Sequence, residues 1–248
     1  MDFMTETAFL AGQQTLAFFQ TGIQAEFKID RSPVTVADKK AEELIRSRIE
    51  QKYPGHALVG EEFGVSGPDK ASHRWVIDPI DGTKSFLRGV PLYAVLIGLE
   101  IEGVVEVGAA YFPALNEMIA AATGEGCWWN GRRAHVSNVS KLENAWISFT
   151  DPASFAEFGK QAAWEKVQKA SYYRTGWSDA YGYLLAATGR VDVMLDPIMA
   201  EWDCAPFPPI LREAGGYFGD WQGNETIYHQ EGLATNPSLL QEILPLLV

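Results

Sequence analysis

Two carboxylates end an apolar run in the stretch RWVIDPIDGTKSF, where only Pro79 and Ile80 separate Asp78 from Asp81. Gathering negative charge at the end of a buried strand is costly unless a cation neutralises it. Carboxylate oxygens are hard ligands that select Mg²⁺, Mn²⁺ or Ca²⁺, whereas zinc prefers His or Cys. The pattern therefore predicts a site for divalent cations.

Three further acidic segments have a similar local setting. Asp38 lies at the start of a helix predicted in PVTVADKKAEE, and Glu61 and Glu62 end a short apolar strand in ALVGEEFG. Asp203 follows Trp202 directly ahead of another predicted helix. Strand ends and helix starts are where loops build sites in α/β proteins. A single acid of this kind is most often an exposed loop residue, so the Asp-Pro-Ile-Asp-Gly-Thr run carries most of the prediction.

A covalent mechanism is the main alternative for two acids followed by Gly-Thr. Phosphatases of the haloacid-dehalogenase type also end a strand this way, but a single residue separates their acids. There the first Asp is the nucleophile and the second is the acid. In this chain Pro79 and Ile80 both intervene, which changes the side chains that share a face. The spacing favours two metal ligands over a nucleophile–acid pair.

Composition narrows the classes of partner. The chain has 248 residues, 47% of them hydrophobic, and a formal net charge of −12, as expected of a soluble globular protein. An acidic surface repels polyanions, so we expect no nucleic-acid partner.

The two cysteines lack the spacing of a zinc or redox site. The N-terminal apolar run has no basic residue before it and is interrupted by Gly-Gln-Gln, so we expect no membrane span or signal peptide and a cytoplasmic location.

The first part of the chain is predicted to be α+β. Helices are expected near 4–20 and over 36–52, and the second of them has apolar residues at helical spacing. The apolar stripes expected to be buried on these helices are Phe9, Leu10, Leu16, Phe18 and Phe19 on the first, and Ala41, Leu44, Ile45 and Ile49 on the second. Strands are expected at 57–59, 74–78, 92–101 and 104–111. The last two form a hairpin that turns at Glu102–Gly103, and Asn130–Gly131 favours a type I′ turn.

The pattern changes after about residue 140. Strands near 145–149, 171–174 and 191–195 alternate with helices near 154–168, 178–188 and 205–214, the last of them expected to begin just after Asp203. Such alternation is typical of an α/β unit. We therefore expect two halves packed together without a flexible linker, at 1–140 with the DPIDGT segment and at 141–248 with the WD motif and the substrate loops.

Three segments in this order, GEE, WVIDPIDGTKSF and WDCAP…EAGG, resemble the inositol-monophosphatase family of Mg²⁺-dependent, lithium-sensitive phosphomonoesterases. The resemblance covers essentially the whole chain. Within the family, the sequence is most similar to the histidinol-phosphatase branch, because Ser85 stands where typical inositol monophosphatases have Asn and Asp179 stands where they have small residues. The resemblance implies a layered αβαβα sandwich and a homodimer.

The resemblance also implies roles for individual residues. Glu61, Asp78 and the Ile80 carbonyl would hold a first Mg²⁺, and Asp78, Asp81 and Asp203 a second. A third, weaker ion would use Glu61 and water, and Mn²⁺ would be a substitute. Asp38 and Thr83 would orient and deprotonate the attacking water with support from Glu62. The N–H groups of Gly82 and Thr83 would open a helix that receives the phosphate.

The substrate is expected to be L-histidinol phosphate, which is converted to L-histidinol in histidine biosynthesis. Its ammonium and imidazole groups call for carboxylates beyond the metal ligands, and the candidates are Asp179, Asp196 and Glu201, with Ser178 as a further substrate-binding residue. Ser178 and Asp179 would serve equally well as a helix cap. The alternatives are an inositol-1-phosphate or broad-specificity sugar phosphatase, and a catalytically silent regulatory homologue.

Overall fold

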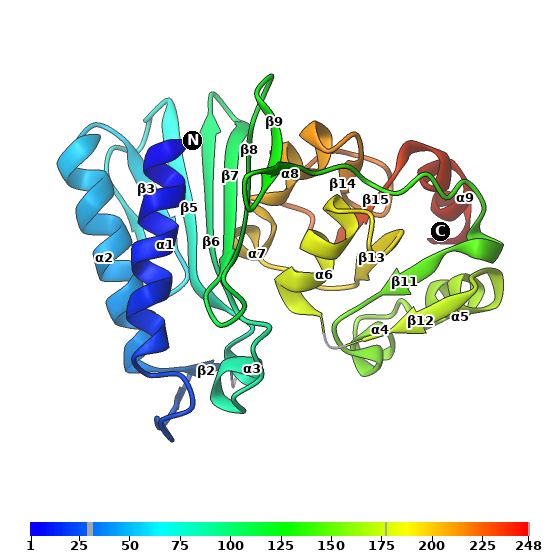
Figure 1. Cartoon of the computed structure of the whole chain (residues 1–248), viewed down its shortest axis with the longest axis horizontal. Helices are drawn as coiled ribbons and strands as arrows, with labels where there is room; N and C mark the ends of the chain where they lie inside the picture. Colours follow the sequence, from blue (N-terminus) through cyan, green and yellow to red (C-terminus); the bar gives the residue numbers. More distant parts are fainter. Residues whose placement is uncertain (29–31, 177, 248) are drawn as a thin grey trace.

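Two β-sheets and three layers of helices alternate along the molecule, as Figure 1 shows for the computed structural model. The structure describes residues 1–28, 32–176 and 178–247. The order of layers is helix, sheet, helix, sheet, helix, which confirms the predicted sandwich. None of the helices within these ranges has the length and apolar character that a membrane span requires.

The first outer layer consists of α1 (Asp2–Leu16) and α2 (Val36–Lys52), which cover one face of an eight-stranded sheet. The sheet runs in the order β10-β9-β8-β7-β6-β5-β3-β4 and is antiparallel except for the pair β3–β5. Its strands are β3 (Ala57–Gly60), β4 (Gly64–Ser66), β5 (His73–Asp81), β6 (Ala94–Ile101), β7 (Val104–Phe112), β8 (Glu117–Ala122), β9 (Gly126–Trp129) and β10 (Arg132–Arg133). A separate small pair, β1 (Glu26–Phe27) and β2 (Pro33–Val34), lies beside α2.

The second sheet is mixed, with five strands in the order β12-β11-β13-β15-β14. Its strands are β11 (Trp146–Ser148), β12 (Tyr173–Thr175), β13 (Val193–Asp196), β14 (Tyr217–Gly219) and β15 (Gly232–Thr235). Between the sheets lie α6 (Asp179–Ala187), α7 (Glu201–Cys204) and α8 (Phe207–Glu213), and one apolar core joins them to the first sheet. The far face carries α5 (Gln161–Ala170) and α9 (Pro237–Leu247), with α4 (Pro152–Glu157) near α5. Two short helices complete the fold, α3 (Thr83–Leu87) and the 3₁₀ turn at Leu142–Asn144.

Helix α1 differs from the expectation in both length and buried face. It ends at Leu16, and Phe9 and Leu10 are exposed, so the predicted apolar stripe was wrong there. Small residues face the sheet instead, because the helix approaches it closely. A Cβ on Gly12 would lie 2.5 Å from the Tyr111 ring. The close approach of the small residues to the sheet, rather than burial of the larger apolar side chains, therefore decides which face of this helix is buried.

The predictions for α2 and for the first hairpin are confirmed. Helix α2 covers 36–52 and buries Ala41, Ile45 and Ile49, while Leu44 is half-buried. The hairpin between β6 and β7 turns at Glu102–Gly103, where both residues have positive φ. Asn130 and Gly131 also have positive φ, as a type I′ turn requires.

The second half contains more elements than the sequence predicted. The helix expected at 154–168 is divided into α4 and α5, whereas the one expected at 205–214 corresponds to α8 and is preceded by a short helix, α7, that was not predicted. Asp203 therefore lies inside a helical turn rather than ahead of it, and accepts the Ala200 N–H at 2.8 Å. The strands β14 and β15 and the helix α9 were missed. Placement of the domain boundary near 140 stays a prediction.

Candidate metal centre and active site

Asp78, Asp81 and Asp203 lie together where the first sheet meets the middle layer of helices. Oxygen atoms of the three carboxylates lie within 4.8 Å of one another. Asp78 and Asp81 come from β5, and Asp203 comes from α7, which packs against β5. The fold therefore gathers acids that are far apart in the sequence.

The end of β5 leads from the two acids into a helix. Pairing with β6 becomes irregular between Asp78 and Asp81, and Asp78 Oδ1 accepts the Ile80 N–H at 3.0 Å. The Ile80 carbonyl accepts the Thr83 hydroxyl at 3.1 Å. Gly82 then adopts φ 75°, a left-handed conformation that glycine takes without strain, and α3 begins at the next residue. The sharp turn and helix start expected after the DPID segment are thus present.

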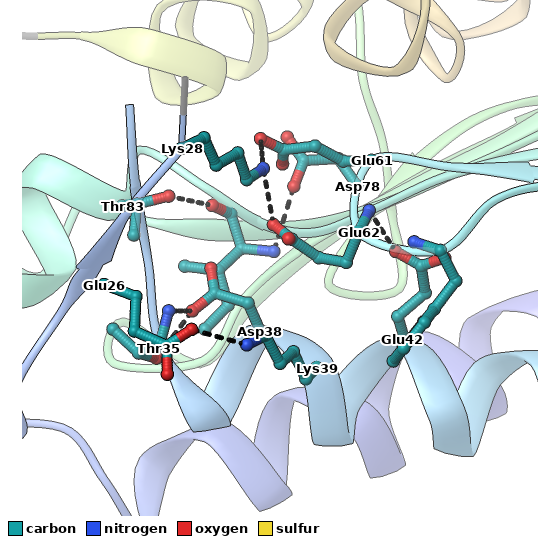
Figure 2. A network of polar contacts seen from close by, with 12 residues as sticks. Glu26, Lys28, Thr35, Asp38, Lys39, Glu42, Glu61, Glu62, Asp78 and Thr83 are labelled. Atoms are coloured by element: carbon teal, nitrogen blue, oxygen red, sulfur yellow. Dashed lines mark hydrogen bonds and ion pairs between the residues drawn. The ribbon is translucent and has the colours of Figure 1, made fainter. Parts of the chain in front are cut away.

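Glu61 and Glu62 approach this group from the turn between β3 and β4 (Figure 2). The Lys28 ammonium binds both, at 2.7 Å from Glu61 Oε1 and 2.8 Å from Glu62 Oε1. In Figure 2 the Glu61 side chain lies beside Asp78. The positive charge of Lys28 thus partly neutralises Glu61 and Glu62, which lie at one edge of the acidic group.

Burial and mutual repulsion raise the pKa of each acid at the centre. Burial, followed by the charges of Glu61 and Asp81, raises the pKa of Asp78 well above its ordinary value. Burial, followed by the charge of Asp179, does the same for the pKa of Asp81. Burial raises the pKa of Asp203 to about 7. Without a counter-ion, burial therefore favours the protonated form of each of these groups.

The central acids have few donors to stabilise their charges. One backbone N–H reaches each of them, from Ile80 to Asp78, from Ala180 to Asp81 and from Ala200 to Asp203. Within the described ranges no Lys or Arg forms an ion pair with any of the three. Buried carboxylates that are short of donors and lie close together fit a divalent cation with oxygen ligands, and the residues present therefore suit Mg²⁺ or Mn²⁺.

Asp38 lies beside this group, in the first turn of α2. Its Oδ2 accepts the Thr35 N–H at 2.8 Å and the Thr35 hydroxyl at 2.5 Å, while its buried Oδ1 has no hydrogen-bond partner in the described residues. Burial raises the pKa of Asp38 to about 6. The Thr83 hydroxyl donates to the Ile80 carbonyl, so no direct hydrogen bond joins the two residues of the predicted water-orienting pair.

A hollow of about 340 Å³ opens next to the central acids. Among the residues that the structure describes, its lining contains six acidic side chains and one basic side chain, Lys84. The acidic residues are Asp81, Asp151, Glu157, Asp179, Asp196 and Asp203. The outer wall comes from α4 and from the segment after β13. Such a lining favours a ligand that carries positive charge.

Two of the predicted substrate residues line this hollow. Asp179 adopts a positive φ at the start of α6 and accepts the Ser85 hydroxyl at 3.2 Å. Asp196 accepts the Thr150 N–H at 3.0 Å and the Tyr183 hydroxyl at 3.1 Å, and burial raises its pKa to about 7. The structure thus brings both acids to the wall of the hollow beside the metal ligands.

The other two predicted substrate residues lie elsewhere. The Ser178 hydroxyl is hydrogen-bonded to that of Ser148 and does not cap α6. Glu201 forms an ion pair with Arg74, which also binds Glu100 at 2.7 Å. Neither Ser178 nor Glu201 lines the hollow.

Sequence reasoning missed several residues of the site. Lys28 stands alone in AEFKID, where no spacing links it to Glu61. Asp151 and Glu157 resemble ordinary residues of an exposed helix, and only the packing of α4 brings them to the hollow. Tyr183, also in the lining, is an apolar-face residue of α6 whose hydroxyl reaches Asp196.

Comparisons with known proteins agree with this geometry. The profile of the "Inositol monophosphatase family" matches residues 1–248. A protein of Chlorobaculum parvum named "Histidinol-phosphatase" is 42% identical over 93% of this chain and 89% of its own length. An "Inositol-1-monophosphatase" of Mesorhizobium japonicum is 30% identical over 98% of this chain and 94% of its own. Among solved structures, "extragenic suppressor protein suhB" from Bartonella henselae superposes with a TM-score of 0.92 at 27% identity, over 100% of this chain and 97% of that one.

Proposed function

This chain belongs to the inositol monophosphatase family and is a phosphoric monoester hydrolase, and from that premise we propose that it hydrolyses L-histidinol phosphate to L-histidinol with Mg²⁺ as cofactor. Two or three ions would bind, with Mn²⁺ as a substitute. The observation that carries the choice of substrate is the acidic lining of the hollow beside Asp81 and Asp203.

The metal ligands in this proposal are four carboxylates and one carbonyl. They are Glu61, Asp78, Asp81, Asp203 and the oxygen of Ile80. Bound divalent ions supply charge stabilisation for the phosphoryl oxygens and the leaving alkoxide, and lower the pKa of water. Glu61, which is paired with Lys28 in this structure, would have to exchange that contact for the ion in order to serve as a ligand.

The protein's own residues handle the proton and hold the phosphate. Asp38 accepts a proton from the attacking water through Oδ1, the oxygen that lacks a partner among the described residues. Its pKa of about 6 suits a base that works near neutral pH. Thr83 orients the same water with support from Glu62, and the N–H groups at Gly82 and Thr83 receive the phosphate.

The remote end of the substrate meets the acids of the hollow. Histidinol phosphate carries an ammonium and an imidazole, and Asp179 and Asp196 are the carboxylates we assign to them. Asp151 on the outer wall is a further candidate. Support comes from the relative that is 42% identical and bears the name of this activity.

The nearest alternative is an inositol-1-phosphate or broad-specificity sugar phosphatase. The relative that is 30% identical over 98% of this chain supports it. An inositol ring offers only hydroxyl groups, so it would bring no positive charge to Asp179 and Asp196. A silent regulatory homologue is the third reading, and turnover of any small phosphate monoester with Mg²⁺ would exclude it.

A comparison of substrates tests the proposal. With Mg²⁺ present, kcat/KM for L-histidinol phosphate should exceed that for myo-inositol 1-phosphate by about a hundredfold or more, and Li⁺ should inhibit both reactions. Asp179→Asn should raise KM for histidinol phosphate about tenfold, a loss of roughly 1.4 kcal/mol, and leave the inositol ester unaffected. Equal kcat/KM values for the two esters would refute the assignment. The homodimer also stays a prediction, which light scattering would test.

A further inference from the structure

Glu42 is a fully buried carboxylate one helical turn after Asp38 on α2. Three donors reach it. Its Oε2 accepts the Glu62 N–H at 2.8 Å, and its Oε1 accepts the Phe63 N–H at 3.3 Å and Arg46 Nε at 2.7 Å. Two of the three donors are backbone groups of the turn between β3 and β4, so this carboxylate ties the turn to the helix.

Arg46 continues the same attachment to the end of the turn. Its guanidinium donates to the Ser66 hydroxyl at 2.8 Å and to the Gly64 carbonyl, both in β4. Glu42 and Arg46 thus hold the turn along its length, and we call this pair with its contacts the Glu42–Arg46 bracket.

Close packing fixes the bracket against β3. A Cβ placed on Gly60 would lie 1.9 Å from Glu42 Oε1, so only glycine leaves room for the carboxylate at the end of this strand. The next residue donates its own N–H to the Ile77 carbonyl of β5 at 3.2 Å. The backbone that enters the turn therefore has little freedom to shift.

The turn held in this way presents Glu61 and Glu62 to the metal site. Figure 2 shows Glu42 on one side of the turn, and Glu61 with Asp78 and Lys28 on the other. When both carboxylates are ionised, as cation binding requires, Glu61 and Asp78 repel each other, and this repulsion favours movement of the turn away from the site. The hydrogen bonds to Glu42 oppose that movement.

We infer that Glu42 is a positioning residue, which fixes the backbone of the β3–β4 turn so that the Glu61 carboxylate reaches a divalent cation shared with Asp78. The inference rests on the proposed function, because it takes Glu61 as a metal ligand. Residues that orient a metal ligand typically change metal affinity ten- to a hundredfold when they are replaced.

Direct measurement of metal binding tests the inference. In Glu42→Gln an amide N–H₂ replaces one acceptor oxygen that faces the backbone donors, at nearly constant volume. The dissociation constant for Mn²⁺, measured by calorimetry and by the electron paramagnetic resonance signal of free Mn²⁺, should rise at least about tenfold. At saturating Mn²⁺, kcat should return to within about threefold of the wild-type value, because the reacting groups are unchanged.

Asp220→Asn is the matched control. Asp220 is also fully buried and accepts two backbone N–H groups, from Gln222 at 2.9 Å and Asn224 at 2.7 Å, but it does not line the hollow. This control should lose thermal stability without a change in Mn²⁺ affinity. A folded Glu42→Gln protein that binds Mn²⁺ within twofold of the wild type would overturn the inference, as would equal losses of affinity in Glu42→Gln and Asp220→Asn.

A milder variant decides the question if Glu42→Gln does not fold. Glu42→Asp keeps the charge but draws the oxygens back from the Glu62 N–H, and it should weaken Mn²⁺ binding about threefold or more. Unchanged affinity in this variant would overturn the inference. A wild-type protein that binds no Mn²⁺ would overturn both this inference and the proposed function. Wild-type binding without turnover of histidinol phosphate would overturn the substrate alone.

Discussion

Asp78 and Asp220 are both buried aspartates, yet their surroundings differ. Asp220 accepts N–H groups from Gln222 and Asn224 and contacts His229 Nδ1 at 2.6 Å. Although burial acts to raise its pKa, these hydrogen bonds together lower it. Asp78 accepts the N–H of Ile80 and otherwise faces other carboxylates, and its pKa is raised.

The difference separates two uses of a buried acid. Asp220 has its donors built into the loop after β14, so the folded chain stabilises its charge. Among the described residues Asp78 has no such set of donors, which fits a charge supplied by a bound cation. In this pair the number of hydrogen-bond donors, and not the degree of burial, distinguishes the structural acid from the candidate metal ligand.

The largest expected effect is the loss of catalysis in Asp78→Asn. Removal of the carboxylate that we propose two ions share should lower kcat with Mg²⁺ by about a thousandfold or more, since several kcal/mol of transition-state stabilisation would be lost. The midpoint of thermal unfolding without metal should stay equal or rise, because one of the repelling charges is gone. Steady-state kinetics and calorimetry with EDTA would measure the two effects. Near-normal turnover would contradict the two-metal interpretation.

The next effect is the pH dependence of stability without metal. The raised pKa of Asp203, about 7, means that the folded state binds more protons than the unfolded state between pH 4 and 7. The free energy of unfolding should therefore fall as pH rises through this window, by up to about 1.4 kcal/mol per pH unit for one such group. Asp220 has the opposite sign, because its lowered pKa gives stability that is lost as the pH falls below about 4.

Urea unfolding with EDTA at pH 5, 6 and 7 would measure this slope. Saturating Mg²⁺ should flatten or reverse it, because cations replace the protons. A slope unchanged by Mg²⁺ would show that the central acids do not bind the ion.

The smallest effect is expected for Asp220→Asn. The amide should place an N–H₂ group against the backbone donors and lower the free energy of unfolding by about 2 kcal/mol. At a temperature where the protein stays folded, kcat/KM should remain within about twofold of the wild-type value. A large loss of activity in the folded variant would contradict a purely structural role for Asp220.

Much of the fold near the metal site could be predicted, because local patterns there agree with the tertiary structure. Helix α2 has a regular apolar face, and the turns at Glu102–Gly103 and Asn130–Gly131 carry residues that tolerate positive φ. The DPIDGT segment combines a strand end, a glycine turn and a helix start. Each of these signals lies within a few residues of sequence.

The remainder depends on contacts between distant segments. Phe9 is apolar but exposed, because Gly12 sets the approach of α1 to the sheet. In the sequence Glu42 resembles an exposed residue of an amphipathic helix. It is buried because α2 packs against the turn between β3 and β4. The helix after Asp203 was predicted, but the short helix α7, which contains Asp203 and ends before Pro206, was not.

The separation of Asp78 from Asp203 along the chain bears on the kinetics of folding. Asp203 reaches Asp78 only when α7 has docked on β5, a contact between segments far apart in sequence, and such contacts are costly in chain entropy until the intervening segments are ordered. A cation bound by both acids would therefore stabilise the native state more than the folding transition state. Its binding would lengthen the lifetime of the folded protein by slowing unfolding, and would leave the rate of refolding nearly unchanged.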